Sequence, residues 1–213
     1  LWKPYFIHKA LIEECAEGDI LFYLDAAAFF ISDVRMIEKV MDDDIYATCL
    51  PYIEADWTKS EAFDIMDMDK EVYKNSFQYQ ASFMAFRKSM RSIMFVEEWL
   101  NNCCNPDLIN PAQNIGKQIE TFQNHRMDQS CFSLLCKKYN VSPHKDPTQF
   151  GIWGYPEVRG ARYVGVKMKN EYPIVIVLHR LKDFGLRNKL RLVKRTMCLI
   201  SKNIIKNIRR KRC

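Results

Sequence analysis

Two carboxylates and a histidine in this sequence stand where they could do chemistry. Asp25 directly follows the apolar stretch 20–24, and His179 directly follows the apolar stretch 173–178. Asp128 and Gln129 lie within His-Arg-Met-Asp-Gln-Ser, residues 125–130. Carboxylates and imidazoles bind divalent cations, and they also serve as general bases. These residue types therefore indicate metal binding, binding of a hydroxylated substrate, or proton transfer.

Each of these residues also has a structural interpretation, and the local sequence leaves both open. Asp25 could cap the turn or helix that follows its strand, and Asp128 is a good helix N-cap. A single histidine at a strand end, such as His179, is often structural. Trp57 could contact a sugar or phosphate, or it could be the hydrophobic staple of the helix that Thr58-Lys-Ser-Glu begins.

The elements that must position these residues alternate between strands and helices. Strands 20–24 and 173–179 are apolar on both faces, which is typical of buried strands. Thr58-Lys-Ser-Glu has the form of a capping box, and Ser32 is expected to cap the helix after it. The alternation predicts an α/β fold with a mostly parallel sheet, whose ligands bind beyond the carboxyl ends of the strands. We expect strands at 20–24, 45–51, 77–86 and 173–179, and helices at 4–16, 89–102 and 128–140.

Charge is distributed unevenly along the 213 residues, whose net charge is +6. Residues 180–213 hold 13 of the 32 Lys and Arg and 1 of the 26 Asp and Glu, which gives +12 there and −6 in residues 1–179. Apolar residues at 190, 193, 197, 200, 204 and 208 keep helical spacing between these basic residues. A basic amphipathic helix of this kind suits an anionic membrane surface, contacted through residues 187–212. Packing of the same stripe on the body, or non-specific binding of nucleic acid, are the alternatives.

Several classes of protein lack support in the sequence. It has no P-loop, no Gly-x-Gly-x-x-Gly and no Gly-x-Ser-x-Gly motif. None of the eight cysteines forms a Cys-x-x-Cys pair, so a zinc site is not expected. The cysteines lie mostly within apolar runs, which fits buried, reduced thiols better than a disulfide framework and favours a reducing compartment. No apolar run approaches the roughly 18 residues of a membrane-spanning helix.

Five segments taken in order resemble one group of enzymes. They read LWKPYFIHKAL, GDILFYLDAAAFF, WTKSEAF, FRKSMRSIMFVEEWL and FQNHRMDQSCFSLLCKKYN. Together they are similar to GT-A-fold glycosyltransferases of the surface- or capsular-polysaccharide type, over residues 1 to about 150. The resemblance implies a Rossmann-like catalytic domain at residues 1–180, followed by the basic helix at 181–213. The family's first βα unit, which holds the nucleobase, would precede Leu1, so we expect this chain to lack it.

The same resemblance implies a nucleotide-sugar donor, linked to UDP or GDP, and a glycan or lipid-linked acceptor. Asp25 matches the acid of the family's D-x-D-like motif, and His179 loosely matches a late histidine that completes a site for Mn²⁺ or Mg²⁺. Ala27 stands where a second acid would be, so the remaining metal ligands must come from elsewhere.

For the rest of the site, the resemblance assigns Asp128 and Gln129 to catalysis near the sugar or the acceptor. Lys3, Trp57 and Arg126 are expected on the donor-binding side, where Arg126 would offset phosphate charge. We therefore predict a metal-dependent glycosyltransferase, cytoplasmic and peripheral to the cytoplasmic membrane. The alternative is a non-catalytic protein that binds membranes or nucleic acid through its basic tail.

Overall fold

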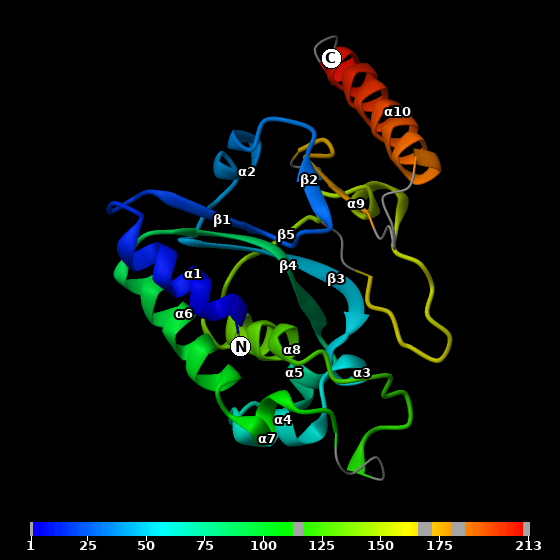
Figure 1. The fold of residues 1–213 in the computed structure, drawn as a ribbon. Coiled ribbons are helices and arrows are strands. Elements are labelled where there is room, and N and C mark those ends of the chain that lie inside the picture. The colour runs from blue at the N-terminus through cyan, green and yellow to red at the C-terminus, as the bar shows by residue number, and fades with distance from the viewer. Residues whose placement is uncertain (1, 113–116, 166–171, 180–185, 211–213) are drawn as a thin grey trace. The chain divides into compact units, whose positions relative to one another are not determined.

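The computed structural model, drawn in Figure 1, describes residues 2–112, 117–165, 172–179 and 186–210. Its chain divides into two compact units. The first unit comprises residues 1–23, 41–144 and 156–168, and the second comprises residues 24–40, 145–155 and 169–213. The expected domain boundary between residues 180 and 181 lies outside the described residues.

A four-stranded sheet forms the centre of the first unit, with strand order β1-β4-β3-β5. β3 runs antiparallel to β4 and parallel to β5, so the α/β class is confirmed but the sheet is mixed rather than mostly parallel. The last residue of β3, Ile53, pairs with the first residue of β4, Phe77, so β4 begins at the end of the sheet where β3 finishes. A parallel β4 would instead need a connection that crosses to the opposite end of the sheet. The strands are β1 (Ile20–Leu24), β3 (Ile45–Ile53), β4 (Phe77–Arg87) and β5 (Pro143–His144).

Burial differs sharply among these strands. β3 and β4 are almost entirely buried, whereas all five residues of β1 are only half-buried. The prediction that residues 20–24 form a fully buried strand was therefore wrong. β1 lies at the edge of the sheet, and its position in the sheet order rather than its composition sets its exposure.

Helices cover the sheet and complete the core of the first unit. α1 packs against α6, beside which it lies in Figure 1, and α8 packs against β4. Between α6 and α8, the ring of Phe132 lies 5.6 Å from that of Phe95 and 5.0 Å from that of Trp99. The longer helices are α1 (Trp2–Glu13), α6 (Met90–Cys103) and α8 (Asp128–Lys138), and the short ones are α3 (Glu54–Trp57), α4 (Ser60–Ile65), α5 (Glu71–Lys74) and α7 (Pro106–Ile109).

Two capping predictions were wrong, because the hydroxyl groups bind more distant partners. The Thr58 hydroxyl donates to Glu54 Oε1 instead of capping α4. The Ser32 hydroxyl donates to the carbonyl oxygen of Ile174 instead of capping α2. By contrast, Ser89 caps α6 with a reciprocal hydrogen bond to Ser92.

The second unit is built on a two-stranded antiparallel sheet, in which β2 pairs with β6. Leu199 of α10 is fully buried in a small apolar cluster with Ile174 and Val177. Within the described residues, no helix has both the length and the apolar character needed to cross a membrane. The elements of this unit are β2 (Ala28–Phe30), α2 (Arg35–Glu38), α9 (Phe150–Trp153), β6 (Ile176–Leu178) and α10 (Leu186–Arg210).

Candidate functional site

The candidate site centres on Asp128, the first residue of α8. Met127, the residue before the helix, has φ 47° and ψ −117°, a conformation that costs a non-glycine residue about 1–3 kcal/mol. The Ser130 hydroxyl and the Arg126 N–H both donate to the Trp57 carbonyl oxygen, and these bonds hold the turn against α3. Trp99 Nε1 donates to the Asp128 carbonyl oxygen, which fixes the first turn from the core side.

Asp128 forms an ion pair with Lys3 of α1. The Lys3 Nζ atom lies 2.9 Å from Asp128 Oδ2 and donates to the Ala81 carbonyl oxygen at 2.8 Å. The side chains of Lys3 and Asp128 are 12% and 28% exposed, so the pair is accessible to a ligand from one side. Residues from α1, β4 and α8 thus meet at one point.

This ion pair forms one wall of a pocket of about 200 Å³. The pocket combines an aromatic ring, two apolar side chains and two opposite charges, which is the mixture typical of small-molecule sites. Its lining residues are Trp2, Lys3, Ile109, Met127 and Asp128.

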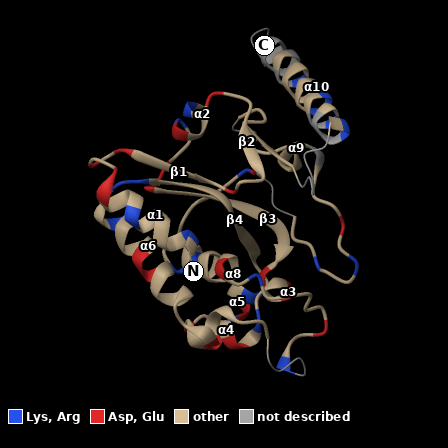
Figure 2. Ribbon diagram, viewed as in Figure 1, with Lys and Arg blue, Asp and Glu red and all other residues tan. Residues whose placement is uncertain are grey.

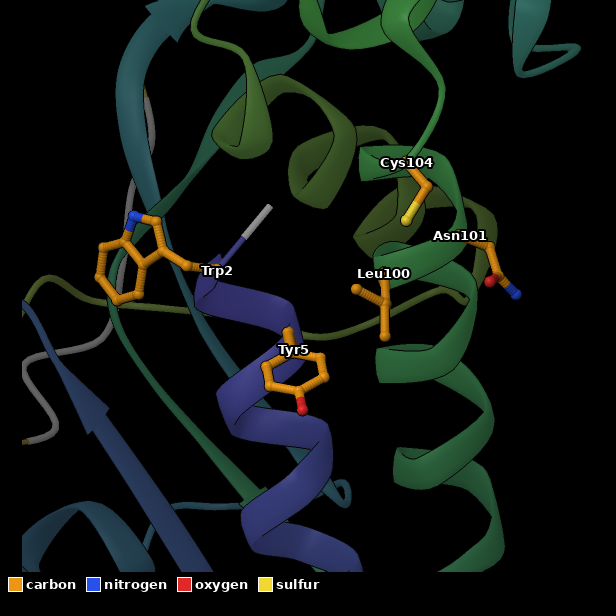
Figure 3. Close-up of a pocket in the computed structure, with 5 residues that line it drawn as sticks. All are labelled: Trp2, Tyr5, Leu100, Asn101 and Cys104. Carbon is orange, nitrogen blue, oxygen red and sulfur yellow. The ribbon is translucent and has the colours of Figure 1, made fainter.

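A second, larger pocket of about 530 Å³ lies between α1 and the end of α6 and is almost entirely apolar. Figure 3 shows Trp2 and Tyr5 extending from α1, while Leu100 and Asn101 come from α6 and Cys104 directly follows it. Trp2 lines both pockets, of which one carries charged residues and the other is apolar.

Arg126 stacks on aromatic rings on the other side of the turn. Its guanidinium carbon lies 3.9 Å from the ring centroid of Trp57 and 5.2 Å from that of Tyr52. Arg126 Nη1 donates to Gln78 Oε1 at 3.1 Å, and this bond fixes the orientation of the guanidinium plane. Trp57 Nε1 is buried without a hydrogen-bond partner in the described part of the chain, and such a donor calls for an explanation.

The Gln129 side chain is held at both ends by the protein. Its Nε2 donates to Gln78 Oε1 at 2.9 Å, and its Oε1 accepts from the Ala81 N–H at 3.3 Å. Gln129 therefore ties α8 to β4 beside the Lys3–Asp128 pair. Gln78 connects Arg126 and Gln129 but was not predicted, although a glutamine inside an apolar strand was the signal that could have revealed it.

A buried polar cluster lies behind Gln78, and sequence reasoning missed it as well. Glu54 is fully buried and accepts hydrogen bonds from Thr58 and Gln78 on Oε1. On Oε2 it accepts from Ser133 and from the ammonium group of Lys137. Burial lowers the pKa of Lys137, and the neighbouring Glu54 carboxylate partly opposes that shift. Because these groups satisfy each other in the interior, the cluster is structural.

His125, which precedes Arg126, is buried and neutral. Its Nδ1 accepts from the Lys59 N–H at 3.3 Å, so its Nε2–H donates to the Leu108 carbonyl oxygen at 2.8 Å. Burial lowers the pKa of His125 to about 4. The ring therefore joins the start of α4 to α7, and it is not a proton acceptor at neutral pH.

Asp25 and His179 both belong to the second unit. The Ala28 N–H donates to the Asp25 carbonyl oxygen, and the His179 N–H donates to the Ala27 carbonyl oxygen at 2.8 Å. Since Ala28 pairs with Leu178, Asp25 and His179 lie at the same end of the β2–β6 ladder. The strands beside them form an antiparallel pair, not the neighbouring parallel strands that the sequence had suggested.

The donor set at this end of the ladder is one carboxylate and one imidazole. No group of three or more His, Cys, Asp or Glu side chains within the described residues is arranged to hold a metal ion. Carboxylate and imidazole are both ligand types for divalent cations, and Mg²⁺ and Mn²⁺ commonly take only one or two protein ligands when substrate phosphates supply the rest.

The predicted site residues thus fall into two groups. Lys3, Trp57, Arg126, Asp128 and Gln129 lie in the first unit, and Asp25 and His179 lie in the second. Comparison of this chain with known protein families, with curated proteins and with solved structures gives no match.

Proposed function

We propose that this chain is a glycosyltransferase of GT-A-like fold, which moves a sugar from a nucleotide-sugar donor to an acceptor hydroxyl in surface-glycan biosynthesis. One observation carries the proposal. The segments containing Lys3 and Asp128, two of those on which the family resemblance rests, line one pocket together, and a third, containing Trp57, is bonded to Ser130 of the Asp128 segment. Nothing in the local sequence requires these distant segments to meet.

The chemistry of this pocket suits a sugar. A pyranose ring presents apolar C–H groups that pack on an aromatic face, and Trp2 offers such a face. The hydroxyl groups of the sugar need charged or polar partners, which the Asp128 carboxylate and the Lys3 ammonium group supply. The volume of about 200 Å³ suits one sugar ring rather than a whole nucleotide.

In the proposed reaction, Asp128 acts on the acceptor. An acceptor hydroxyl donates a hydrogen bond to the Asp128 carboxylate, and its proton moves toward that group as the oxygen attacks the anomeric carbon. Lys3 orients the carboxylate, while Gln129 acts as a positioning residue because its amide is bonded to Gln78 and Ala81.

The remaining predicted residues belong to two units. In the first unit, the Arg126 guanidinium, supported by Trp57, would offset negative charge on a bound donor. In the second unit, Asp25 and His179 would hold a divalent cation. Such a cation neutralises charge on the departing nucleoside diphosphate.

A screen of UDP- and GDP-linked sugars with Mn²⁺ tests the proposal. We expect the protein to release UDP or GDP from at least one sugar donor, and to bind that nucleotide in calorimetry. Asp25→Asn should abolish this binding, whereas Asp64→Asn, which changes an exposed carboxylate of α4, should leave it intact. Absence of nucleotide binding, or binding that is indifferent to Asp25→Asn, would refute the proposal.

The competing proposal is a non-catalytic protein that acts through its basic tail, and the exposed apolar stripe of α10 favours it. Deletion of residues 187–213 separates the two. A glycosyltransferase should keep its turnover on a soluble acceptor after the deletion, whereas a protein that acts through the tail should lose every activity.

A further inference from the structure

The helix α10 has a row of apolar side chains that the protein does not cover. Successive residues of a helix are about 100° apart, so the members of this row fall within about 80° of the circumference. Their exposed fractions run from 38% to 75%, which is high for large apolar side chains. The apolar stripe consists of Leu186, Leu190, Val193, Met197, Ile200 and Ile204.

A different face of α10 packs on the protein. Leu199 is fully buried against Ile174 and Val177 of the second unit, and it lies about 140° from the centre of the stripe. The stripe is therefore not the surface by which the helix attaches to this unit.

Basic side chains flank the stripe, and no acidic residue accompanies them. Figure 2 shows Lys and Arg on α10 but no Asp or Glu, and the sequence of Leu186–Arg210 contains nine basic residues and no acidic one. Arg187, Arg191 and Lys194 are exposed, and they lie between about 80° and 140° from the centre of the stripe. Such side chains can extend toward lipid headgroups while their aliphatic parts cover apolar surface.

We propose that α10 lies flat on an anionic phospholipid bilayer, with the apolar stripe in the acyl boundary and the basic flank at the headgroups. The stripe spans 19 residues from Leu186 to Ile204, about 27 Å, which suits an extended planar surface better than a compact pocket. Its charge complements anionic lipid, and its basic residues keep it at the interface. The inference does not depend on sugar transfer.

Sedimentation of the full chain with lipid vesicles tests this assignment. We expect strong binding to vesicles of phosphatidylcholine and phosphatidylglycerol in equal amounts, weak binding to phosphatidylcholine alone, and loss of binding at high salt. The triple variant Arg187→Gln/Arg191→Gln/Lys194→Gln should bind the anionic vesicles about a hundredfold more weakly. Replacing Leu190, Val193 and Met197 by Gln should weaken binding roughly tenfold or more.

A matched control has the same change in net charge. Lys39→Gln/Lys70→Gln/Arg159→Gln removes three exposed basic residues outside α10 and should bind like the unaltered chain. Equal weakening in both charge variants would overturn the proposal, because net charge alone would then explain binding. It would also be overturned if the chain bound duplex or single-stranded nucleic acid but no vesicle, or if the stripe variant changed only self-association.

Discussion

Two Lys–carboxylate pairs of the first unit have the same chemistry but different surroundings. The Glu54–Lys137 pair lies in the interior, with its side chains 0% and 8% exposed. The Lys3–Asp128 pair lies at the rim of a pocket, with its side chains 12% and 28% exposed. Thr58, Gln78 and Ser133 also occupy the oxygens of Glu54.

The difference shows how burial separates a structural pair from one suited to bind a ligand. A carboxylate that already has four protein hydrogen bonds cannot accept a substrate hydroxyl without losing one of them. A pair at a pocket rim can exchange solvent for a ligand at small cost to folding. Interior changes should therefore affect stability most, and changes at the rim should affect binding and turnover.

The largest effect is expected from Lys137→Met. This change leaves the Glu54 carboxylate buried without its cation, which costs about 3–5 kcal/mol in comparable buried pairs. Urea unfolding would measure the loss. Lys138→Met provides the matched control on the same helix, because Lys138 is half exposed, and its change should cost less than about 1 kcal/mol. Equal losses of unfolding free energy in the two variants would contradict the distinction between buried and exposed ion pairs.

A second interior effect concerns pH. The pKa of His125 is about 4 in the folded protein and about 6.5 when unfolded, so the unfolded chain binds the additional proton first. Stability is therefore retained above pH 6.5 and is lost as the pH falls toward 4, by roughly 3 kcal/mol for this group.

The variant His125→Gln isolates this contribution. Burial raises the pKa of Asp146 to about 6. The contribution of Asp146 to the unfolding free energy therefore has the opposite pH dependence and decreases as the pH rises. Subtracting the unfolding free energies of the variant from those of the unaltered chain removes the Asp146 effect. A difference that is independent of pH between 4 and 6.5 would show that His125 is not held neutral.

At the pocket rim, we expect Asp128→Asn to separate stability from function. The substitution keeps the shape of the side chain and should change the unfolding free energy by less than about 1 kcal/mol. Sugar transfer should fall by about a hundredfold, the usual effect of losing a general base. Asp64→Asn serves again as the control, and unchanged transfer by the Asp128 variant would exclude a catalytic role.

The smallest effect is expected at Met127, whose positive φ suits glycine. Met127→Gly should raise the unfolding free energy by up to about 1 kcal/mol, because glycine adopts this conformation without steric cost. The same change removes a side chain that lines the pocket, so sugar binding should weaken. A variant that is less stable than the unaltered chain would show that the backbone there is not strained.

Features that depend on near neighbours in the chain were predictable. Apolar spacing located α6 and α8 and the strands β3 and β4, because helix and strand periodicity are local properties. The capping box at Thr58 was predicted and does not form, since its hydroxyl is drawn to the buried Glu54. At this position the buried Glu54 carboxylate requires hydrogen-bond donors, and this requirement outweighs the local preference of Thr58 for capping the helix.

The sequence alone determined the α/β class and the basic amphipathic character of α10, because composition and periodicity suffice for both. Only the tertiary structure decided that Lys3 meets Asp128, that Gln78 joins Arg126 to Gln129, and that Leu199 is buried while the stripe is exposed. These contacts join residues far apart in the chain. Their formation depends on how the whole core packs, which no local pattern specifies.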